Sequence, residues 1–433
     1  MRTLGMLGLH GLVVFAAACG DGEPAGGGPD AGPGVDGSVD GSSGCVAGYA
    51  GAACVLAAYD AAVAGCAPEA VETLRAELEA RADLGPLWAG GRVLFRADGP
   101  VAFAGAWNEW STTALVASPV CGGDVIVAVG AVPEGHWPYK VVDGQAWSLD
   151  PHNRAFAYDD FAGNADGKNS VLNTPGSGRG HLVGLDRACS AALGNCRDVT
   201  AYLPAGYTAS DRTYPVLFMH DGQNVWDDHD CCFGHTGWEV NVTLDAEIAE
   251  GRVAPLVVIA AAHSTARNNE YGLSPSAMDA FIAFQVTELQ PAALAQVRWN
   301  GARVAVAGSS LGGLISMHLA LRHPETYVAA VSLSGAFWPN NEALKAQLPA
   351  YGKQPVGVYL DHGGDVGTNA DGAADSVEVR DAMASLGWQV ATSPACTFGD
   401  RTLCYHAEPG AAHDELAWKA RAWRFLRFVS PPQ

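Results

Sequence analysis

The chain has 433 residues, of which 46 are acidic and 25 are basic, and its formal net charge at pH 7 is -21. This length is sufficient for two domains that each bury a hydrophobic core. The charge balance and the lack of a basic patch argue against nucleic acid as a partner, because nucleic-acid binding needs Lys and Arg to neutralise phosphates. We interpret the acidic surface as a source of solubility rather than as a means of repelling acidic substrates.

The N-terminal segment has the layout of an export signal. Arg2 precedes a mostly apolar run over residues 4–18, which is too short for a membrane span. The run ends in Ala16-Ala17-Ala18-Cys19, which resembles a bacterial lipobox, although Ala16 stands where Leu is usual. We therefore predict a signal over residues 1–19 and lipidation at Cys19, in preference to plain secretion, so that the protein is tethered to a membrane of the cell envelope.

Residues 20–44 are dominated by Gly, Asp, Pro and Ser, and this composition predicts a disordered linker. A helical segment that contains cysteines follows over residues 45–90. With Cys19 set aside, the 11 cysteines leave an even number, which fits disulfides in an oxidising compartment. The spacing has no zinc-site pattern, so we expect no metal and no cofactor. The predicted disulfides are Cys189 with Cys196, Cys396 with Cys404, and two bridges among Cys45, Cys54, Cys66 and Cys121, while Cys231 and Cys232 form a vicinal ring or pair elsewhere.

Residues 91–175 have an all-β pattern, in which short apolar runs alternate with clusters of Gly, Pro, Asn and Asp. This pattern predicts a small β-sandwich. The stretch from Phe103 to Trp110, Phe-Ala-Gly-Ala-Trp-Asn-Glu-Trp, resembles the early-set immunoglobulin-like modules of isoamylases and of the glycogen-binding domain of the AMP-activated kinase β subunit. Further matches follow in order at 133–135, 139–140, 147–151 and 169–171.

In the glycan-binding members of that group, two tryptophans, a lysine and an asparagine form a sugar platform. An indole face covers the apolar side of a pyranose, and amide and ammonium groups bond to its hydroxyls. The resemblance therefore implies a glycan site, and its matching positions are Trp110, Lys140, Trp147 and Asn169. The alternative is a module that packs on the following domain and shapes its site without binding glycan.

Residues 185–433 predict an α/β-hydrolase, with a mostly parallel sheet and helices on both faces. The pentapeptide Gly308-Ser309-Ser310-Leu311-Gly312 lies between the apolar run 303–307 and a helical pattern that Pro324 ends. A G-x-S-x-G turn from strand to helix exposes its serine as a nucleophile, and the glycines permit the sharp turn. We therefore predict that Ser310 is the catalytic nucleophile.

A serine nucleophile requires a histidine base and an acid, which follow it in the order acid, then histidine, in this fold. His413 lies in a short loop ahead of a terminal helix, where the base is expected, whereas His362 and His406 lack this position. For the acid we predict Asp365, because it follows the strand 356–360 on a glycine-rich turn. The other candidates for the acid are Asp361, Asp371 and Asp375.

An acyl-transfer site also needs donors for the developing oxyanion. The strand 215–219 ends in His220-Asp221-Gly222-Gln223-Asn224. The backbone N–H of Gly222 or Gln223, together with that of Leu311, is the predicted oxyanion hole. The alternative interpretation of the first segment is an ordinary turn at a strand end.

From about Cys189 onward the chain resembles the putative-esterase family of α/β-hydrolases, which includes enterochelin esterases, feruloyl esterases, S-formylglutathione hydrolase and mycolyltransferases. The resemblance implies Ser310 as nucleophile, His413 as base and Asp365 as its partner. It also implies that Arg267, Glu270 and Tyr271 lie near the site, where a structural ion pair competes with substrate contact as their role. The matching stretches are His220-Asp221-Gly222-Gln223-Asn224, Trp238-Glu239-Val240, Arg267-Asn268-Asn269-Glu270-Tyr271, 308–313, Arg322-His323-Pro324-Glu325, Ser332-Leu333-Ser334-Gly335, and Ala412-His413 with Trp418.

These features together predict an exported serine esterase. The matches at Trp110 and Trp147 favour a carbohydrate-linked ester, either feruloyl or acetyl, on a small molecule or a polysaccharide. A siderophore trilactone of the enterochelin type is the alternative substrate. Acyl transfer to a sugar and a non-catalytic glycan-binding surface protein are the remaining alternatives.

Overall fold

A mostly parallel sheet with buried strands forms the centre of the C-terminal part of the chain. The computed structural model describes residues 44–159, 167–226, 237–352, 354–392, 396 and 398–432, so the predicted signal, Cys19, Cys231 and Cys232 lie outside the described residues. The strand order from one edge is β17-β18-β16-β15-β14-β12-β13-β11-β10. All these neighbours pair in parallel except β11, which is antiparallel to β13 and to β10. The strands are β10 (His181–Ser190), β11 (Asn195–Leu203), β12 (Val216–Met219), β13 (Val257–Ala261), β14 (Val304–Ser309), β15 (Tyr327–Leu333), β16 (Gly357–His362), β17 (Gln389–Thr392) and β18 (Thr402–Ala407).

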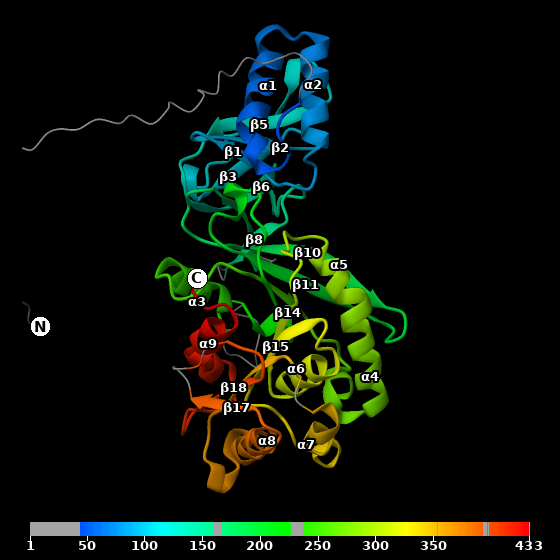
Figure 1. The fold of residues 1–433 in the computed structure, drawn as a ribbon. Helices are drawn as coiled ribbons and strands as arrows, with labels where there is room; N and C mark the ends of the chain where they lie inside the picture. The colour runs from blue at the N-terminus through cyan, green and yellow to red at the C-terminus, as the bar shows by residue number, and fades with distance from the viewer. Residues whose placement is uncertain are drawn as a thin grey trace, which may run out of the picture. The chain divides into compact units, whose positions relative to one another are not determined.

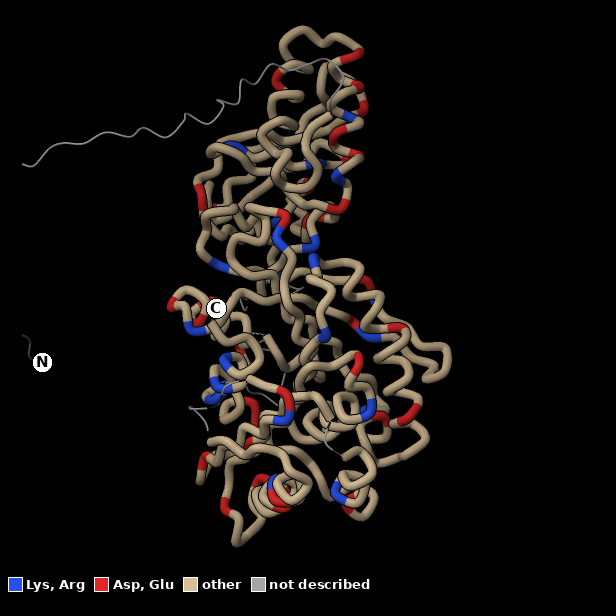
Figure 2. The backbone as a smooth tube through the Cα atoms, viewed as in Figure 1, with Lys and Arg blue, Asp and Glu red and all other residues tan. Residues whose placement is uncertain are grey.

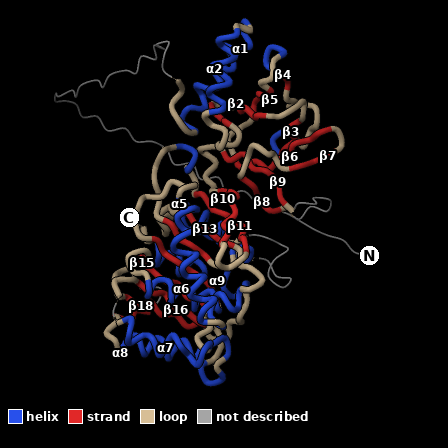
Figure 3. Tube along the Cα trace, turned by 90° about the vertical axis from the view of Figure 1, so that its right-hand side faces the viewer, coloured by secondary structure: helices blue, strands red, loops and turns tan. Residues whose placement is uncertain are grey.

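Helices cover both faces of this sheet, as Figure 1 and Figure 3 show. Alternate residues of a strand enter different cores: Val304 and Val306 join one cluster, while Ala305 and Ala307 join the other. Such two-sided burial is typical of parallel sheets and accounts for the nearly continuous apolar strands. The first face carries α4 (Pro275–Phe284), α5 (Gln290–Leu294), α6 (Leu311–Arg322), α7 (Pro339–Tyr351) and α8 (Ala373–Ser385), and the second carries α3 (Val240–Ala249) and α9 (Glu415–Val429).

The N-terminal part contains two sheets that pack face to face. One sheet has the order β1-β2-β5-β4, and its Phe95 stacks on Phe103 of the other sheet, with ring centroids 4.3 Å apart. The second sheet is continuous with the central sheet, because β8 pairs with β10. The strands are β1 (Leu87–Ala89), β2 (Arg92–Arg96), β3 (Ala102–Gly105), β4 (Ser118–Pro119), β5 (Ile126–Ala131), β6 (His136–Asp143), β7 (Ala146–Ser148), β8 (Ala155–Tyr158) and β9 (Lys168–Asn173).

Two helices, α1 (Ala52–Gly65) and α2 (Pro68–Glu79), pack on the outer face of β1, β2 and β5. By its contacts, Cys45–Gln433 forms one compact unit, so the helical segment and the two strand-rich parts share their contacts rather than standing alone. The short helical turns are η1 (Tyr49–Gly51), η2 (Ala106–Asn108), η3 (Val120–Gly122), η4 (Tyr207–Ala209), η5 (Gly222–Asn224), η7 (Asn269–Leu273), η8 (Gln285–Leu289), η9 (Val366–Thr368) and η10 (Ala370–Gly372).

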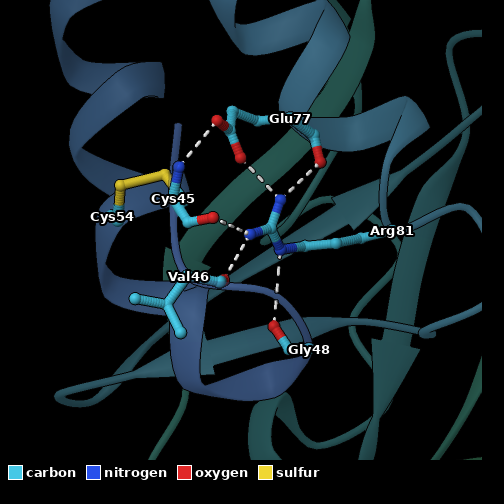
Figure 4. The surroundings of a disulfide bond; sticks show 6 residues. All are labelled: Cys45, Val46, Gly48, Cys54, Glu77 and Arg81. Atoms are coloured by element: carbon cyan, nitrogen blue, oxygen red, sulfur yellow. Dashed lines mark hydrogen bonds and ion pairs between the residues drawn. A yellow bond between two sulfur atoms is a disulfide. The ribbon is translucent and has the colours of Figure 1, made fainter. Parts of the chain in front are cut away.

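Disulfides fasten the peripheral segments. The predicted pairs Cys189–Cys196 and Cys396–Cys404 are confirmed, and the four N-terminal cysteines pair as Cys45–Cys54 and Cys66–Cys121. Beside the Cys45–Cys54 disulfide, the guanidinium of Arg81 donates to the carbonyl oxygens of Cys45 and Val46 and to the carboxylate of Glu77, as Figure 4 shows. The Arg81 side chain is 3% exposed. Its buried bonds to Cys45, Val46 and Glu77 therefore connect the start of the described chain to α2.

Charged residues of both signs are interspersed along the described backbone in Figure 2. In the part of the chain that the structure describes, no helix has the length and apolar character needed to cross a membrane.

Candidate active site

Ser310 lies at the turn between β14 and α6, and this confirms the strand–turn–helix that the sequence predicts. Its φ of 54° and ψ of -124° are outside the regions that L-residues prefer. A Cβ built on Gly308 would lie 2.6 Å from the carbonyl carbon of Gly312, so only glycine fits the first position of the turn. The strained serine is thereby held at the end of the strand, where a nucleophile of this fold is expected.

His413 bonds to Asp371, and the prediction that Asp365 is its partner is wrong. His413 Nδ1 lies 2.5 Å from Asp371 Oδ1, whereas Asp365 is exposed and its Oδ1 accepts from the N–H of Gly367 at 2.6 Å. The reason is the path of the loop after β16. Residues with positive φ, Gly364, Asn369 and Asp371 itself, fold this loop into two successive turns, η9 and η10, which return Asp371 to the strand end. Asp365 only caps the first of these turns.

Backbone bonds bring the histidine loop to the same strand end. The N–H of Gly364 donates to the carbonyl of Ala411 at 2.9 Å. Asp414 then caps α9 by accepting from the N–H of Ala417, and the ring of Trp418 meets the His413 imidazole edge-on at 5.1 Å between centroids. Because Asp371 occupies Nδ1, Nε2 is the nitrogen of His413 that remains for proton transfer.

Asp371 is held in its ionised form. Burial by itself would raise the pKa of this carboxyl, but hydrogen bonds from His413, the Ser334 hydroxyl and the Gly363 N–H outweigh burial and lower the pKa below its ordinary value. The Asp371 side chain is 2% exposed, compared with 43% for His413. The pair therefore combines a buried anion with an imidazole that solvent and a substrate can reach.

The rival groups have other partners. His362 Nε2 lies 2.6 Å from the Tyr405 hydroxyl, and His406 Nε2 lies 2.7 Å from Glu408 Oε2. Asp361 is fully buried and accepts from Arg421 Nε at 3.0 Å. His220 is a further histidine near the serine turn, because a Cβ built on Gly312 would lie 3.5 Å from the Cβ of His220. Burial lowers the pKa of this imidazole to about 4, so it is neutral at physiological pH.

The predicted oxyanion donors lie at the same sheet edge as Ser310. Leu311 begins α6. Gly222 and Gln223 lie in η5, which follows the end of β12, the strand beside β14, after two residues. A Cβ built on Gly312 would lie 3.1 Å from Asp221 Oδ2, which brings the two turns together. Arg267 fixes Asp221 through two bonds of 2.7 Å each, so the turn that carries Gly222 and Gln223 is held rigidly.

Of the three residues predicted near the substrate, two are interior. Glu270 is 1% exposed and its Oε2 accepts from Arg197 Nη2 at 2.6 Å, which is the structural ion pair. Tyr271 is also 1% exposed and packs on the ring of His220. Arg267 alone of the three keeps partial exposure, 22% of its side chain, but it is engaged with Asp221.

The predicted glycan positions divide into two pairs. Trp110 and Trp147 are 37% and 46% exposed, and their rings lie 6.3 Å apart between centroids. Lys140 and Asn169 are each 5% exposed, and Asn169 Nδ2 donates to Asp159 Oδ2 at 2.6 Å. The structure therefore gathers the two indoles at the surface but keeps the lysine and the asparagine inside.

Sequence reasoning assigned no role to Ser334 or Arg421, which contact the acid directly. The Ser334 hydroxyl donates to Asp371 Oδ2 at 2.6 Å, and Arg421 Nη2 lies 3.9 Å from the same oxygen. A signal for Arg421 was present in the sequence, because its spacing of three residues from Trp418 places the two on one face of the terminal helix. A charge on the buried face of a helix needs a buried partner.

A mostly parallel sheet, a serine at a strand-to-helix turn and a His–Asp pair at the same edge are features of an α/β-hydrolase. The family model described as putative esterase matches residues 190–421, and the chain therefore belongs to the putative-esterase family. It is a carboxylic ester hydrolase.

Similar proteins match about half of the chain. The uncharacterized protein YbbA of Bacillus subtilis (strain 168) is 25% identical over 233 residues, which are 50% of this chain and 86% of YbbA. An endo-1,4-beta-xylanase/feruloyl esterase of Xylanibacter ruminicola is 25% identical over 245 residues, 53% of this chain and 29% of that protein.

The solved structures that match the chain include two esterases. A ferulic acid esterase has 20% identity and a TM-score of 0.44, over 58% of this chain and 98% of that one. The enterobactin esterase FES from Shigella flexneri has 17% identity and a TM-score of 0.43, over 81% of this chain and 96% of that one.

Proposed function

We propose that this protein is an exported serine esterase in which Ser310, His413 and Asp371 act as a triad. The observation that carries the proposal is the 2.5 Å bond from His413 Nδ1 to Asp371 Oδ1 at the sheet edge where the strained Ser310 turn lies. Asp371 fixes the tautomer in which Nδ1 carries the proton, and Nε2 is then free to accept the proton of the Ser310 hydroxyl.

The reaction follows from these positions. Ser310 Oγ attacks the ester carbonyl while His413 takes its proton, and the N–H of Leu311 with that of Gly222 or Gln223 binds the oxyanion. The imidazolium then protonates the departing alcohol, which leaves an acyl-serine. Water, deprotonated by His413, releases the acid and restores the serine. Each step moves one proton through the same imidazole.

A labelled fluorophosphonate tests the assignment of the nucleophile. Such a probe phosphonylates a serine only where a base activates it. We expect a single labelled peptide, the one that contains Ser310, and no labelling after denaturation. A label on a different serine would contradict the proposed triad.

We further propose that the substrate is a carbohydrate-linked ester, because two exposed indoles lie side by side in the N-terminal part. Trp110→Ala and Trp147→Ala should each reduce retention on acetylated or feruloylated xylan at least tenfold, with turnover of p-nitrophenyl acetate unchanged. Trp299→Ala, which removes an indole that is 36% exposed in the C-terminal part, is the matched control. Equal retention of all variants would count against a glycan role for the indole pair.

The names of the similar enterobactin esterase structures favour a second candidate, a siderophore trilactone. Feruloylated xylan fragments and enterobactin assayed side by side would separate the two. A transferase variant of the reaction, in which a sugar hydroxyl replaces water, would show as acylated sugar among the products.

Export and lipid anchoring are proposed from the N-terminal sequence, and the disulfides of the described chain support an oxidising compartment. Metabolic labelling with a radioactive fatty acid in a bacterial host should mark the protein, and Cys19→Ser should remove the label. Labelling that persists in this variant would exclude Cys19 as the anchor.

A further inference from the structure

We infer that Ser334 is a positioning residue whose hydroxyl fixes the Asp371 carboxylate for His413. This inference rests on the proposed function of the Asp371–His413 pair. Ser334 directly follows β15, is fully buried, and has no place in the proton transfers described above.

The neighbours of Ser334 Oγ determine which of its hydrogen bonds it accepts and which it donates. Trp418 Nε1 lies 3.0 Å from this oxygen and Arg421 Nη2 lies 2.7 Å from it. An indole N–H and a guanidinium can only donate, so the oxygen accepts from both. Its single hydrogen is then left for Asp371 Oδ2, at 2.6 Å. A serine hydroxyl is ordinarily free to rotate, but the hydroxyl of Ser334 can donate only to Asp371.

Hydrogen bonds also fix the orientation of the Asp371 carboxylate. Asp371 Oδ2 accepts from the Ser334 hydroxyl and from the N–H of Gly363, while Oδ1 accepts from His413. Because both oxygens accept hydrogen bonds, the carboxylate cannot turn about its Cβ–Cγ bond without breaking hydrogen bonds in a buried site. These hydrogen bonds therefore determine the orientation of Oδ1 and, through it, the orientation of the His413 imidazole.

Ser334 itself is held in an unusual conformation. Its φ is 46°, and its N–H donates to the backbone oxygen of Asp361 at 2.9 Å. Arg421 is anchored on Asp361 Oδ2 at 3.0 Å, with exposures of 2% and 0% for the two side chains. Positive φ at a non-glycine residue persists only where the surroundings enforce it, and here they aim the hydroxyl at the acid.

The same strand end also supports the nucleophile. The N–H of Ser310 donates to the carbonyl of Leu333 at 2.9 Å, and the N–H of Ala336 donates to the carbonyl of Ser310 at 3.0 Å. Residues 333–336 therefore bind the serine turn through their backbone and the acid through the Ser334 side chain. This short segment sets the positions of both ends of the triad.

The test is Ser334→Ala, measured by two independent readouts. The first is kcat for p-nitrophenyl acetate per site titrated with fluorophosphonate, which we expect to fall about ten- to a hundredfold, the effect of losing a hydrogen bond to a charged group, with KM within threefold. The second is the low-field proton resonance of His413 Nδ1–H, recorded without substrate. We expect this resonance in wild type and its loss or broadening in Ser334→Ala.

Ser332→Ala is the matched control. Ser332 lies two residues earlier on β15, is equally buried, and among the described residues its hydroxyl has no hydrogen-bond partner. This variant should keep both kcat and the resonance. If Ser334→Ala does not fold, Trp418→Phe retains an aromatic ring beside His413 but removes the indole N–H, and it should change both readouts in the same direction to a smaller degree.

A kcat within threefold of wild type, or an unchanged resonance, in the folded variant would overturn the inference. The two readouts also separate its failure from that of the proposed function. If the wild type cleaves no ester, the resonance still reports whether Ser334 positions Asp371 against His413.

Discussion

Ser310→Ala is expected to abolish turnover of p-nitrophenyl acetate, with a loss in kcat of about four orders of magnitude or more. The Ser310 hydroxyl is the proposed acyl acceptor, and the backbone donors and the His–Asp pair cannot form an acyl-enzyme in its place. The fold should survive, because Ala and Ser have similar preferences at a φ of 54° and the N–H bond to Leu333 is unchanged.

The measurement is the initial rate per folded molecule, with the thermal unfolding midpoint as a check on structure. Ser309→Ala is the matched control, since it removes the neighbouring hydroxyl, on a residue that is 5% exposed. It should remain within a few fold of wild type. Undiminished activity in Ser310→Ala would refute the assignment of the nucleophile.

The second large effect is expected at the acid. Asp371→Asn should lower kcat by about three to four orders of magnitude, because a neutral amide no longer stabilises the imidazolium and can present its NH₂ to Nδ1, which selects the wrong tautomer. Asp365→Asn changes the exposed carboxyl that only caps η9, and it should leave kcat within about twofold. The measurement is kcat of the two variants and of wild type on the same ester at one pH.

Comparison of these two variants separates Asp371 from Asp365, two of the four carboxyls that the sequence left as candidates for the acid. A large loss in Asp365→Asn with near-normal rates in Asp371→Asn would mean that the loop rearranges in the working enzyme.

The dependence of stability on pH gives a second test of the role of Asp371. The pKa of Asp371 is lowered on folding, so its hydrogen bonds stabilise the fold at neutral pH and are lost as pH falls through the folded-state pKa. Asp371→Asn should be less sensitive to acid over that range.

Several features of the site could be predicted because they depend on local sequence. The strand, the glycine-flanked turn and the helix around Ser310 are fixed by apolar periodicity and by the steric need for glycine. The position of His413 just ahead of α9 follows from the short loop that precedes the terminal helix in the sequence. The disulfides that close short loops, Cys189–Cys196 and Cys396–Cys404, follow from proximity along the chain.

The features that were missed depend on how distant segments meet. Asp365 lies nearer the strand end in sequence, but positive-φ residues turn the loop so that Asp371 reaches His413 instead. For Glu270 the sequence left substrate contact and a structural ion pair open, and the structure forms the ion pair in the interior, with Arg197 from β11. Lys140 matches a sugar-binding position, but it lies on β6 with 5% exposure. The sequence pattern contains no information on which of these polar groups will find a buried partner.

The sequence by itself therefore determined the class of fold, the serine turn and the placement of the histidine ahead of the last helix, since each is written in a run of neighbouring residues. Only the tertiary structure decided which carboxylate joins the histidine and which polar side chains turn inward. The physical reason is that burying a charge is favourable only when a complementary group from another segment lies within hydrogen-bonding distance, and that distance is set when the segments pack together.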